Sequence, residues 1–332
     1  MRLLLTAYWA ALPDVMVRDM SLYMGLDTSN YTTSAAAFDA ATEALWQVKQ
    51  LLPVKAGERG LRQSDAVFHH VKQLPDLLEQ LFSTVSKQDI AAFGVSDRPM
   101  EADNSYMPCF LAGEGMARAL AASSCRPLFR FTHQQGHVMA ALYGAKRLDL
   151  LKAPFLAFHV SGGTTEALLV RPHADTVITC TSVARSLDLK AGQLIDRIGV
   201  LLGLPFPAGA ELDKLSQTAT EMRLPHPSME GANCHLSGVE NQCRRLIEQG
   251  VPPDEVARLC LLHVQAALES MTERLLAAYG DLPVVYAGGV MSNTLLRAAL
   301  SKRFGGIFAP PAYSADNAAG IAVLTSLRAE RG

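Results

Sequence analysis

Two histidines in the middle of the chain have the spacing of a metal-binding pair. His133 and His137 lie four residues apart at the expected start of a helix, and residues with this spacing share one helix face, about 6 Å apart at Cβ. Two such imidazoles can bind one divalent cation, although two half-buried histidines near a helix end would show the same spacing. A metalloprotease of this type carries glutamate directly after the first histidine as its general base. Here that residue is Gln134, so the protease interpretation lacks its base.

A third ligand would have to come from a distant part of the chain. Asp316 follows Pro310-Pro311 at the expected junction between a loop and the last helix. An aspartate there can cap the helix, or it can act as a ligand if the helix start faces the histidines. A His₂Asp set with open positions suits Fe(II) or Zn(II). We therefore expect one divalent metal at His133, His137 and Asp316.

Two glycine-rich turns are candidates for phosphate or nucleotide binding. The segment Val160–Thr165 joins two expected strands, and its adjacent glycines allow a tight turn with exposed N–H groups; a plain hairpin turn is the alternative. The segment Ala287–Asn293 follows a buried strand and opens a helix, which suits an anion at the helix N-terminus. Asn293 can bind a ribose or base, or cap that helix. Asp196, on an expected helix, can bind ribose hydroxyls or form a surface ion pair.

The strands and helices that must position these residues occur as one pattern repeated twice. Each half has three strands, followed by helices that alternate with strands, which predicts a mixed sheet covered by helices and a ligand cleft between the halves. The expected strands are 22–27, 34–38, 45–52, 90–95, 128–131, 155–160, 165–170, 176–181, 284–287 and 306–308. The first expected helix begins at the N-cap Ser64, and the last begins at Ala315. The other expected helices are 110–122, 133–144, 190–202, 236–249, 254–278 and 291–303.

Composition agrees with a globular α/β protein and gives no sign of a nucleic-acid partner by itself. The chain has 332 residues, 49% hydrophobic and 19% charged, with a net charge of −2, so it can bury a large core but has no overall basic field. The segment 47–75 carries five basic and two acidic residues, or +3, which suits phosphate contacts or a solvated surface. The six cysteines show no C-x-x-C spacing and are expected to be reduced thiols.

The N-terminal 21 residues are expected to lie outside the folded core. Leu3 to Leu12 form a mostly apolar run behind Arg2. A signal peptide would contain such a run, but the cleavage site is poor, and a start codon further along the chain explains the segment better. Ten apolar residues are too few to span a bilayer. We therefore expect a cytoplasmic protein without a membrane segment.

Taken together, these segments resemble the tRNA threonylcarbamoyladenosine-forming transferases, a family within the actin, sugar-kinase and Hsp70 superfamily. The resemblance extends from about Leu22 to the C-terminus, and the order of the segments is what makes it specific. The eight segments are Gly25–Ser29, His133–His137, Val160–Gly163, Ala191–Asp196, Leu202–Gly209, Leu236–Gly238, Gly288–Asn293 and Asp316–Asn317.

The resemblance implies both a fold and a reaction. The fold would be a two-lobed actin-like ATPase (ASKHA) α/β fold built from duplicated ribonuclease H-like units, with residues 22–147 plus 312–332 in one lobe, 148–311 in the other, and a central cleft. The reaction would move a threonylcarbamoyl group from threonylcarbamoyl-AMP to N6 of the adenosine that follows the anticodon, in tRNAs that read codons starting with A. The implied partners are tRNA, a small paralogous subunit and a P-loop ATPase.

The resemblance also implies roles for individual residues. It makes His133, His137 and Asp316 the metal ligands, with the metal as a Lewis acid on the mixed anhydride. The turns at Asp27, Thr28 and Ser29 and at Gly288 and Gly289 become candidate phosphate loops. The implied adenylate-binding residues are His159, Val160, Ser161, Gly162, Gly163, Asp196, Gly209 and Asn293.

Several positions depart from the family pattern. Gln135 stands where members carry glutamate, and Thr164 stands where they carry histidine. An acidic pair is replaced at Asn30 and Tyr31, and Leu189 and Gln193 replace two further carboxylates. These losses near the expected cleft keep two alternatives open: an O-carbamoyltransferase acting on a small molecule, and a nucleotide-binding paralogue without catalysis.

Overall fold

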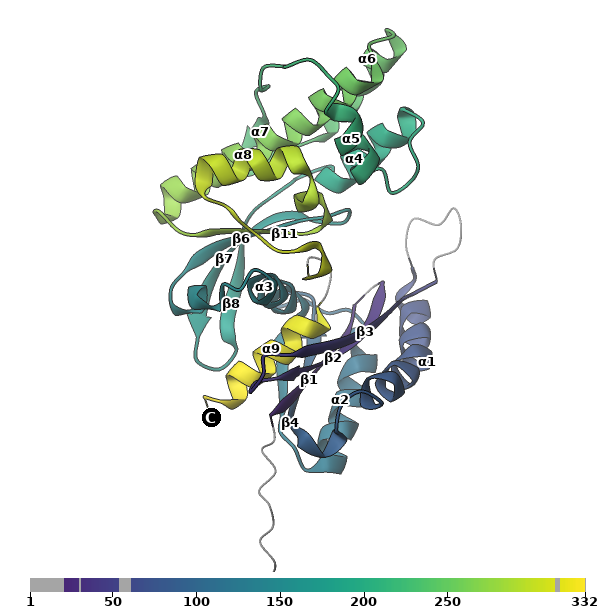
Figure 1. Cartoon of the computed structure of the whole chain (residues 1–332), viewed down its shortest axis with the longest axis vertical. Coiled ribbons are helices and arrows are strands. Elements are labelled where there is room, and N and C mark those ends of the chain that lie inside the picture. Colours follow the sequence, from purple (N-terminus) through teal and green to yellow (C-terminus); the bar gives the residue numbers. More distant parts are fainter. Residues whose placement is uncertain (1–20, 30, 54–60, 314–316, 332) are drawn as a thin grey trace, which may run out of the picture.

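The first of two five-stranded sheets is formed by the N-terminal part of the chain (Figure 1). The structure is a computed structural model that describes residues 21–29, 31–53, 61–313 and 317–331. The strand order is β3-β2-β1-β4-β5. Strands β1 to β3 pair antiparallel as a meander, while β4 and β5 run parallel to β1. The strands are β1 (Leu22–Thr28), β2 (Thr32–Asp39), β3 (Leu45–Leu51), β4 (Ile90–Arg98) and β5 (Leu128–Thr132).

The second sheet repeats the first in order and direction. Its strands are arranged β12-β11-β6-β7-β8, which again places an antiparallel meander next to two parallel strands. The repeated strand pattern predicted from the sequence is therefore confirmed. The strands are β6 (Phe155–Val160), β7 (Thr165–His173), β8 (Val177–Arg185), β11 (Val284–Ala287) and β12 (Ile307–Phe308).

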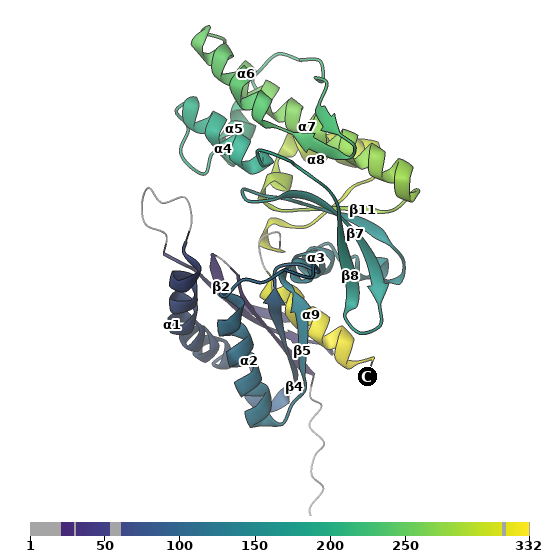
Figure 2. The same cartoon turned by 180° about the vertical axis from the view of Figure 1, so that it is seen from behind.

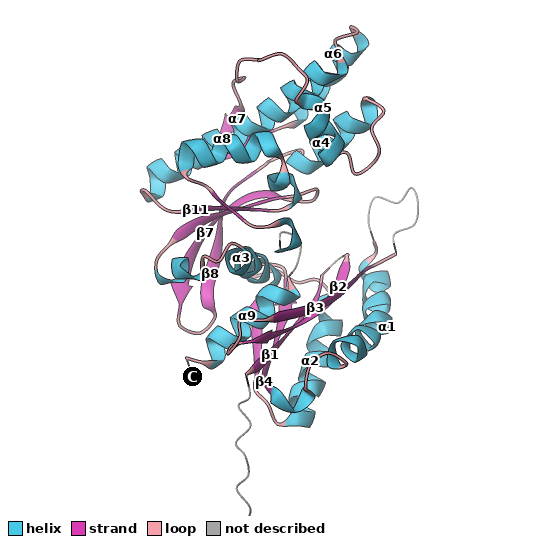
Figure 3. Cartoon of the chain, viewed as in Figure 1, coloured by secondary structure: helices cyan, strands magenta, loops and turns pink. Residues whose placement is uncertain are grey.

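Helices form the layers around these sheets (Figures 2 and 3). Two helices cover one face of the first sheet, two lie between the sheets, and five cover the far face of the second sheet. In this order they are α1 (Gln63–Phe82) and α2 (Phe110–Ser124); α3 (His133–Gly144) and α9 (Ala318–Ala329); and α4 (Ala191–Leu201), α5 (Gly209–Ser216), α6 (Ser237–Glu248), α7 (Pro253–Tyr279) and α8 (Thr294–Phe304).

The alternation of side chains along β6 shows why helices must cover both faces of the second sheet. Leu156 and Phe158 belong to the hydrophobic cluster shared with α7, whereas Phe155 and Ala157 belong to the cluster shared with α3 and α9. Successive residues of a strand point to opposite faces, so a strand with apolar side chains on both faces needs a layer on each side. The inner layer formed by α3 and α9 therefore packs against both sheets.

Helix α9 approaches its neighbours at glycines. A Cβ at Gly320 would overlap the carbonyl oxygen of Gly136 on α3 and come within 2.8 Å of the Ala140 nitrogen. A Cβ at Gly25 on β1 would overlap the carbonyl oxygen of Ala318. Backbone therefore meets backbone on both sides of α9, and only residues without a side chain allow this approach.

Three helix starts differ by two residues or more from the sequence-based expectations. Helix α1 begins at Gln63 with Arg62 as its N-cap, so Ser64 lies inside the helix and does not cap it. The helix expected over 291–303 starts at Thr294, because Asn293 has extended backbone angles and accepts a hydrogen bond from the Leu296 nitrogen. Helix α9 is described from Ala318, with Asn317 as its N-cap.

One short α-helix and two short strands were not predicted. They are α5 and the two-stranded hairpin of β9 (Ser228–Glu230) and β10 (Asn233–His235). Residues 1–20 lie outside the described part of the chain, so the prediction about the N-terminal segment stays a prediction. Within the described ranges, none of the helices combines the length and the apolar character needed to cross a bilayer.

We predict that Gly320→Ala destabilises the protein by about 1–3 kcal/mol, the usual cost of overpacking a core. The added methyl group would meet α3 backbone, which cannot rotate away. Urea unfolding followed by circular dichroism measures the change. The control is Gly115→Ala on α2, where an added Cβ meets nothing within 4 Å; it should leave stability unchanged or raise it by about 1 kcal/mol. Equal stability of the two variants would contradict the backbone contact.

Candidate functional site

Three imidazole rings form a row at the start of α3. The ring centroids of His133 and His137 are 4.6 Å apart, and His159 on β6 lies 4.4 Å from His137. Thr132 caps the helix: its Oγ1 accepts from the Gln135 nitrogen at 3.1 Å, and the Gln135 side chain accepts from the Thr132 nitrogen at 2.7 Å. This reciprocal capping fixes the first turn of α3 and therefore the face on which both helical histidines lie.

A buried carboxylate from the first sheet contacts the first histidine. Asp27 Oδ2 lies 2.8 Å from His133 Nδ1 and accepts from Ser96 Oγ at 2.5 Å, while Oδ1 accepts from the Ser29 nitrogen at 3.1 Å. Burial by itself would raise the pKa of Asp27, but the His133 imidazole and the hydrogen bonds from His133, Ser96 and Ser29 lower it overall. Asp27 is therefore ionised and fully hydrogen-bonded inside the protein.

The other two imidazoles are held in the neutral form. Burial lowers the pKa of His137 well below its ordinary range, and the nearby His159 and His133 rings lower it further. Burial, followed by the proximity of His133, lowers the pKa of His159 to about 4. Neutral imidazoles keep a lone pair on one ring nitrogen and can bind a cation. His159 Nδ1 is buried without a hydrogen-bond partner.

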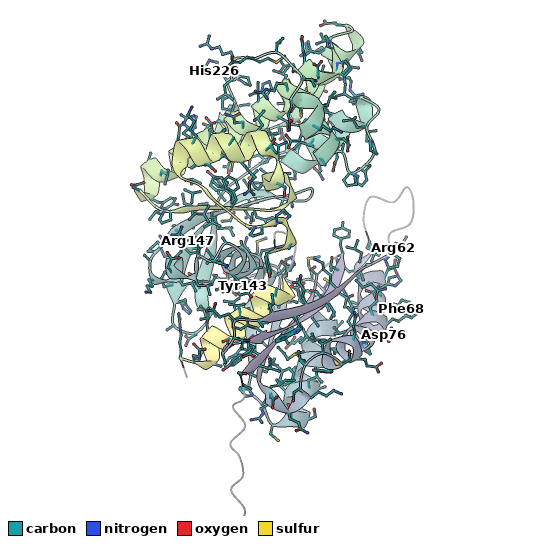
Figure 4. The ribbon with its side chains drawn as sticks, in the orientation of Figure 1. Arg62, Phe68, Asp76, Tyr143, Arg147 and His226 are labelled. Carbon is teal, nitrogen blue, oxygen red and sulfur yellow. The ribbon has the colours of Figure 1, made fainter. Side chains whose placement is uncertain are left out.

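Two of the three predicted metal ligands, His133 and His137, lie among the described residues. Among them, no three His, Cys, Asp or Glu side chains converge closely enough to hold a metal ion. Asp316, the third predicted ligand, lies outside the described residues. The side chains on either side of that segment both contact α3: Tyr313 packs against Tyr143 with centroids 5.4 Å apart, and Asn317 Nδ2 lies 3.4 Å from His133 Nε2 (Figure 4 labels Tyr143).

A pocket of about 470 Å³ brings together five of the residues predicted to bind an adenylate or phosphate. Asp196 accepts a hydrogen bond from the Ala208 nitrogen at 2.8 Å through Oδ1, which leaves its other oxygen for a ligand. Asn293 lines the pocket and also caps α8, so the capping alternative for Asn293 is confirmed. All lining residues come from the second half of the chain. The five predicted residues are Gly162, Asp196, Gly209, Gly289 and Asn293.

The turn between β6 and β7 forms one rim of this pocket. The Ser161 nitrogen donates to the Thr164 carbonyl at 2.7 Å, which closes a hairpin turn. Gly288 has φ +99°, and a Cβ there would overlap the Val160 carbonyl oxygen. A Cβ at Gly192 would come within 2.6 Å of the Ser161 carbonyl oxygen. Gly192 and Gly288 therefore let the first turn of α4 and the segment after β11 pack against this turn. A Cβ added at Gly162 or Gly163 would meet nothing within 4 Å.

Other predicted residues lie elsewhere. His159 lines a different, more apolar pocket of about 210 Å³ beside α3, and Val160 is buried in the core. In the turn predicted to hold phosphate, Thr28 is buried, donates to the Cys109 carbonyl at 3.0 Å and accepts from the Gly113 nitrogen at 3.1 Å. The Thr28 side chain, like the Asp27 carboxylate, is thus occupied inside the protein and is not free to contact a phosphate.

Asp188 also has a structural role instead of a place at the pocket. It accepts hydrogen bonds from the nitrogens of Leu236 and Ser237 and from the Ser237 hydroxyl at 2.6 Å. Burial raises the pKa of Asp188, but the hydrogen bonds from Ser237, Leu236 and Leu189 lower it to about 2. The carboxylate therefore caps the start of α6 and is committed there.

Residue-level reasoning missed a polar contact that joins the two sheets. Gln135 Nε2 donates to Glu101 Oε1 and to the Ile178 carbonyl, both at 2.6 Å, and Glu101 Oε2 accepts from the Cys180 nitrogen at 3.2 Å. Gln134 donates to Glu166 at 3.1 Å. A glutamate at position 135 could not make the two donations, so the glutamine noted in the sequence is matched to Glu101. Glutamine at position 135, where family members carry glutamate, was the sequence signal that could have indicated this contact.

Comparisons with known proteins agree on one family. The family model described as tRNA N6-adenosine threonylcarbamoyltransferase matches residues 54–323. Curated proteins of that name from Bacillus licheniformis and Chromobacterium violaceum are similar to this chain, at 29% and 30% identity. The alignments cover 93% of this chain and 92% of the Bacillus protein, and 92% of this chain and 93% of the Chromobacterium protein.

Solved structures show the fold. HypF from T. kodakarensis superposes with a TM-score of 0.62 at 13% identity over 93% of this chain and 48% of that chain. Component A of the (R)-2-hydroxyglutaryl-CoA dehydratase of Acidaminococcus fermentans gives a TM-score of 0.56 at 16% identity, covering 93% of this chain and 99% of that chain. A ROK hexokinase from Thermus thermophilus gives a TM-score of 0.52 at 16% identity, covering 94% of this chain and 100% of that chain. The predicted two-lobed actin-like α/β fold is confirmed.

We predict that the free energy of unfolding of the metal-free protein falls as the pH is lowered from about 6.5 to about 4. His159 has an ordinary pKa of 6.5 when unfolded and about 4 when folded, so in this range the unfolded chain binds a proton that the folded chain does not. Each such imidazole contributes up to about 1.4 kcal/mol per pH unit.

Urea unfolding at a series of pH values in EDTA measures this slope. His159→Gln should flatten it relative to the wild type. The control His173→Gln, an exposed residue at the end of β7, should not. Parallel curves for the wild type and His159→Gln would show that the His159 imidazole does not titrate as its burial requires.

Proposed function

This chain belongs to the tRNA N6-adenosine threonylcarbamoyltransferase family, and from that premise we propose that it is an acyltransferase that places a threonylcarbamoyl group on N6 of an adenosine in tRNA. The donor in this proposal is threonylcarbamoyl-AMP, and the acceptor is the adenosine after the anticodon in tRNAs reading codons that start with A. The observation that carries the proposal is the row of three imidazoles at the start of α3, together with a pocket lined by residues predicted for the adenylate.

The proposed metal ligands are His133, His137 and Asp316. Two observations support a cation between α3 and the start of α9. His133 and His137 present adjacent imidazoles, and the Asn317 Oδ1 and His159 Nδ1 atoms beside them are buried without hydrogen-bond partners. Buried polar atoms normally have a partner, so unpaired acceptors around two imidazoles fit a bound Fe(II) or Zn(II).

The adenylate would occupy the 470 Å³ pocket between α4, α5 and the segment 289–293. Asp196 offers a carboxylate oxygen to ribose hydroxyls. The turn at Gly162 and the glycine at 289 let the ligand approach the backbone closely. In this arrangement the adenosine part of the donor is held by the second half of the chain, and its acyl end points to the histidines of α3.

The transfer itself needs little covalent chemistry from the protein. The amine nitrogen N6 attacks the carbamoyl carbon, the bond between that carbon and the phosphate oxygen breaks, and AMP leaves with the electron pair while N6 gives up one proton. The bound metal would supply Lewis-acid stabilisation of the negative charge that develops on oxygen. The protein's residues hold donor and acceptor in line, which accounts for a large part of such a rate enhancement.

Contacts with tRNA would fall on the basic segment 47–75 of β3 and α1. Lys49, Arg62 and Lys72 are described there, and Lys72 lies over the Phe68 ring at 5.5 Å; Lys55 and Arg59 lie outside the described residues. Figure 4 shows Phe68 on the outer surface of α1. A small paralogous subunit and a P-loop ATPase are the partners we propose from family membership.

We predict that His137→Ala lowers threonylcarbamoyl transfer by about 100-fold or more, because the loss of a metal ligand removes several kcal/mol of transition-state stabilisation. Mass spectrometry of tRNA nucleosides from a deletion strain gives the readout. Wild type should restore the modified nucleoside and His137→Ala should not, while His173→Ala, at an exposed position at the end of β7, should restore it. Full modification without the gene in a genome with no second copy would refute the proposed function.

We predict that Asp196→Asn lowers the affinity for AMP about 10-fold. The substitution keeps the acceptor for the Ala208 nitrogen but replaces the second oxygen by a donor, which costs a hydrogen bond to a charged group, about 1.5–3 kcal/mol at most. Isothermal titration calorimetry measures the change. Asp149→Asn, an exposed residue paired with Arg147, is the control. Equal AMP affinity in both variants would place the ribose elsewhere.

A further inference from the structure

The hydrogen-bond arrangement of Asp27 has a consequence for the chemistry of His133. The Asp27 side chain is fully buried on β1, and its Oδ2 lies 2.8 Å from His133 Nδ1. All of its contacts come from donors: the Ser29 nitrogen on Oδ1, and Ser96 Oγ and His133 Nδ1 on Oδ2. A buried carboxylate can only accept, so the ring nitrogen facing it must carry the hydrogen.

The opposite nitrogen of the same ring is then fixed as an acceptor. A neutral imidazole carries one N–H, so a proton on Nδ1 leaves the lone pair on Nε2. Nε2 faces the start of α9, where the Asn317 amide nitrogen lies 3.4 Å away. A donor opposite Nε2 is compatible with the tautomer that the carboxylate opposite Nδ1 requires.

We propose that Asp27 is a positioning residue that holds His133 as the Nδ1–H tautomer and so presents its Nε2 lone pair to a divalent cation between α3 and α9. The proposal rests on the metal site proposed above. Histidines that bind metals commonly donate their other N–H to a carboxylate, which fixes the ring and makes the ligand more basic. A purely structural Asp27 would link β1, β4 and α3 without affecting the position of this proton.

The variant Asp27→Asn separates the two roles. The Ser29 N–H faces the first carboxylate oxygen, so the amide oxygen of the asparagine must take that place. Its NH₂ group then faces Ser96 and His133 Nδ1. A donor opposite Nδ1 makes that nitrogen an acceptor, and the proton moves to Nε2. The substitution keeps the shape of the side chain and inverts the tautomer.

Nitrogen-15 NMR of the histidine rings in metal-free protein, in alkaline buffer, reports the tautomer directly. The His133 signals are identified by their loss in His133→Gln. We expect Nδ1–H in the wild type and Nε2–H in Asp27→Asn. The matched control Ser96→Ala removes one donor to the same carboxylate but leaves the carboxylate in place, and should keep Nδ1–H. The wild-type spectrum is informative even if a variant fails to fold.

Equilibrium dialysis with Co²⁺ adds the second measurement. We expect Asp27→Asn to bind Co²⁺ about 10–100-fold more weakly than the wild type, with a smaller loss for Ser96→Ala. Any of three results would overturn the proposal: the Nε2–H tautomer in the wild type, the same tautomer in Asp27→Asn as in the wild type, or a Co²⁺ affinity of Asp27→Asn equal to that of the wild type. If the wild type shows the Nδ1–H tautomer but binds no Co²⁺, the proposed metal site is wrong and the assignment of the His133 proton stands.

Discussion

Helix α9 contacts β1 on one side and α3 on the other at distances that exclude a methyl group. The contact requires Gly25 on the strand and the pair Gly136 and Gly320 between the helices. Because backbone meets backbone, neither helix can slide without opening the core, and packed interiors tolerate little such movement. The start of α9 is therefore fixed beside the first turn of α3, which is the turn that carries both histidines. The geometry of the proposed metal site is a consequence of this packing.

Around that contact, three buried polar side chains form hydrogen bonds to other elements. Asp27 joins β1 to α3, Thr28 joins β1 to α2, and Gln135 joins α3 to β8 and to the segment after β4. Buried polar groups are costly when unpaired, so these bonds specify one relative placement of the layers. His159 Nδ1 and Asn317 Oδ1 are buried there without a hydrogen-bond partner. Burial also lowers the pKa of His137 and of His159, and such shifted pKa values are typical of a functional site.

The local part of this organisation could be predicted from the sequence, and the long-range part could not. The spacing of His133 and His137, the two glycine turns and most strands follow from short-range periodicity, and the structure has them within a few residues. The contact between Asp27 and His133 joins positions 106 apart, and nothing in the spacing of single residues indicates it. Asp188 lies close to Asp196 in sequence, yet its carboxylate bonds to the start of α6. Helix α5, at eight residues, is too short to show a clear period.

The placement of α9 also affects how the protein folds. Helix α9 fills the layer between the two sheets, and its Ala318 packs against Gly25 on β1, 293 positions earlier in the chain. Contacts between residues so far apart in sequence slow folding. Until α9 docks, the sheet faces that it covers expose apolar side chains, and exposed apolar surface favours aggregation.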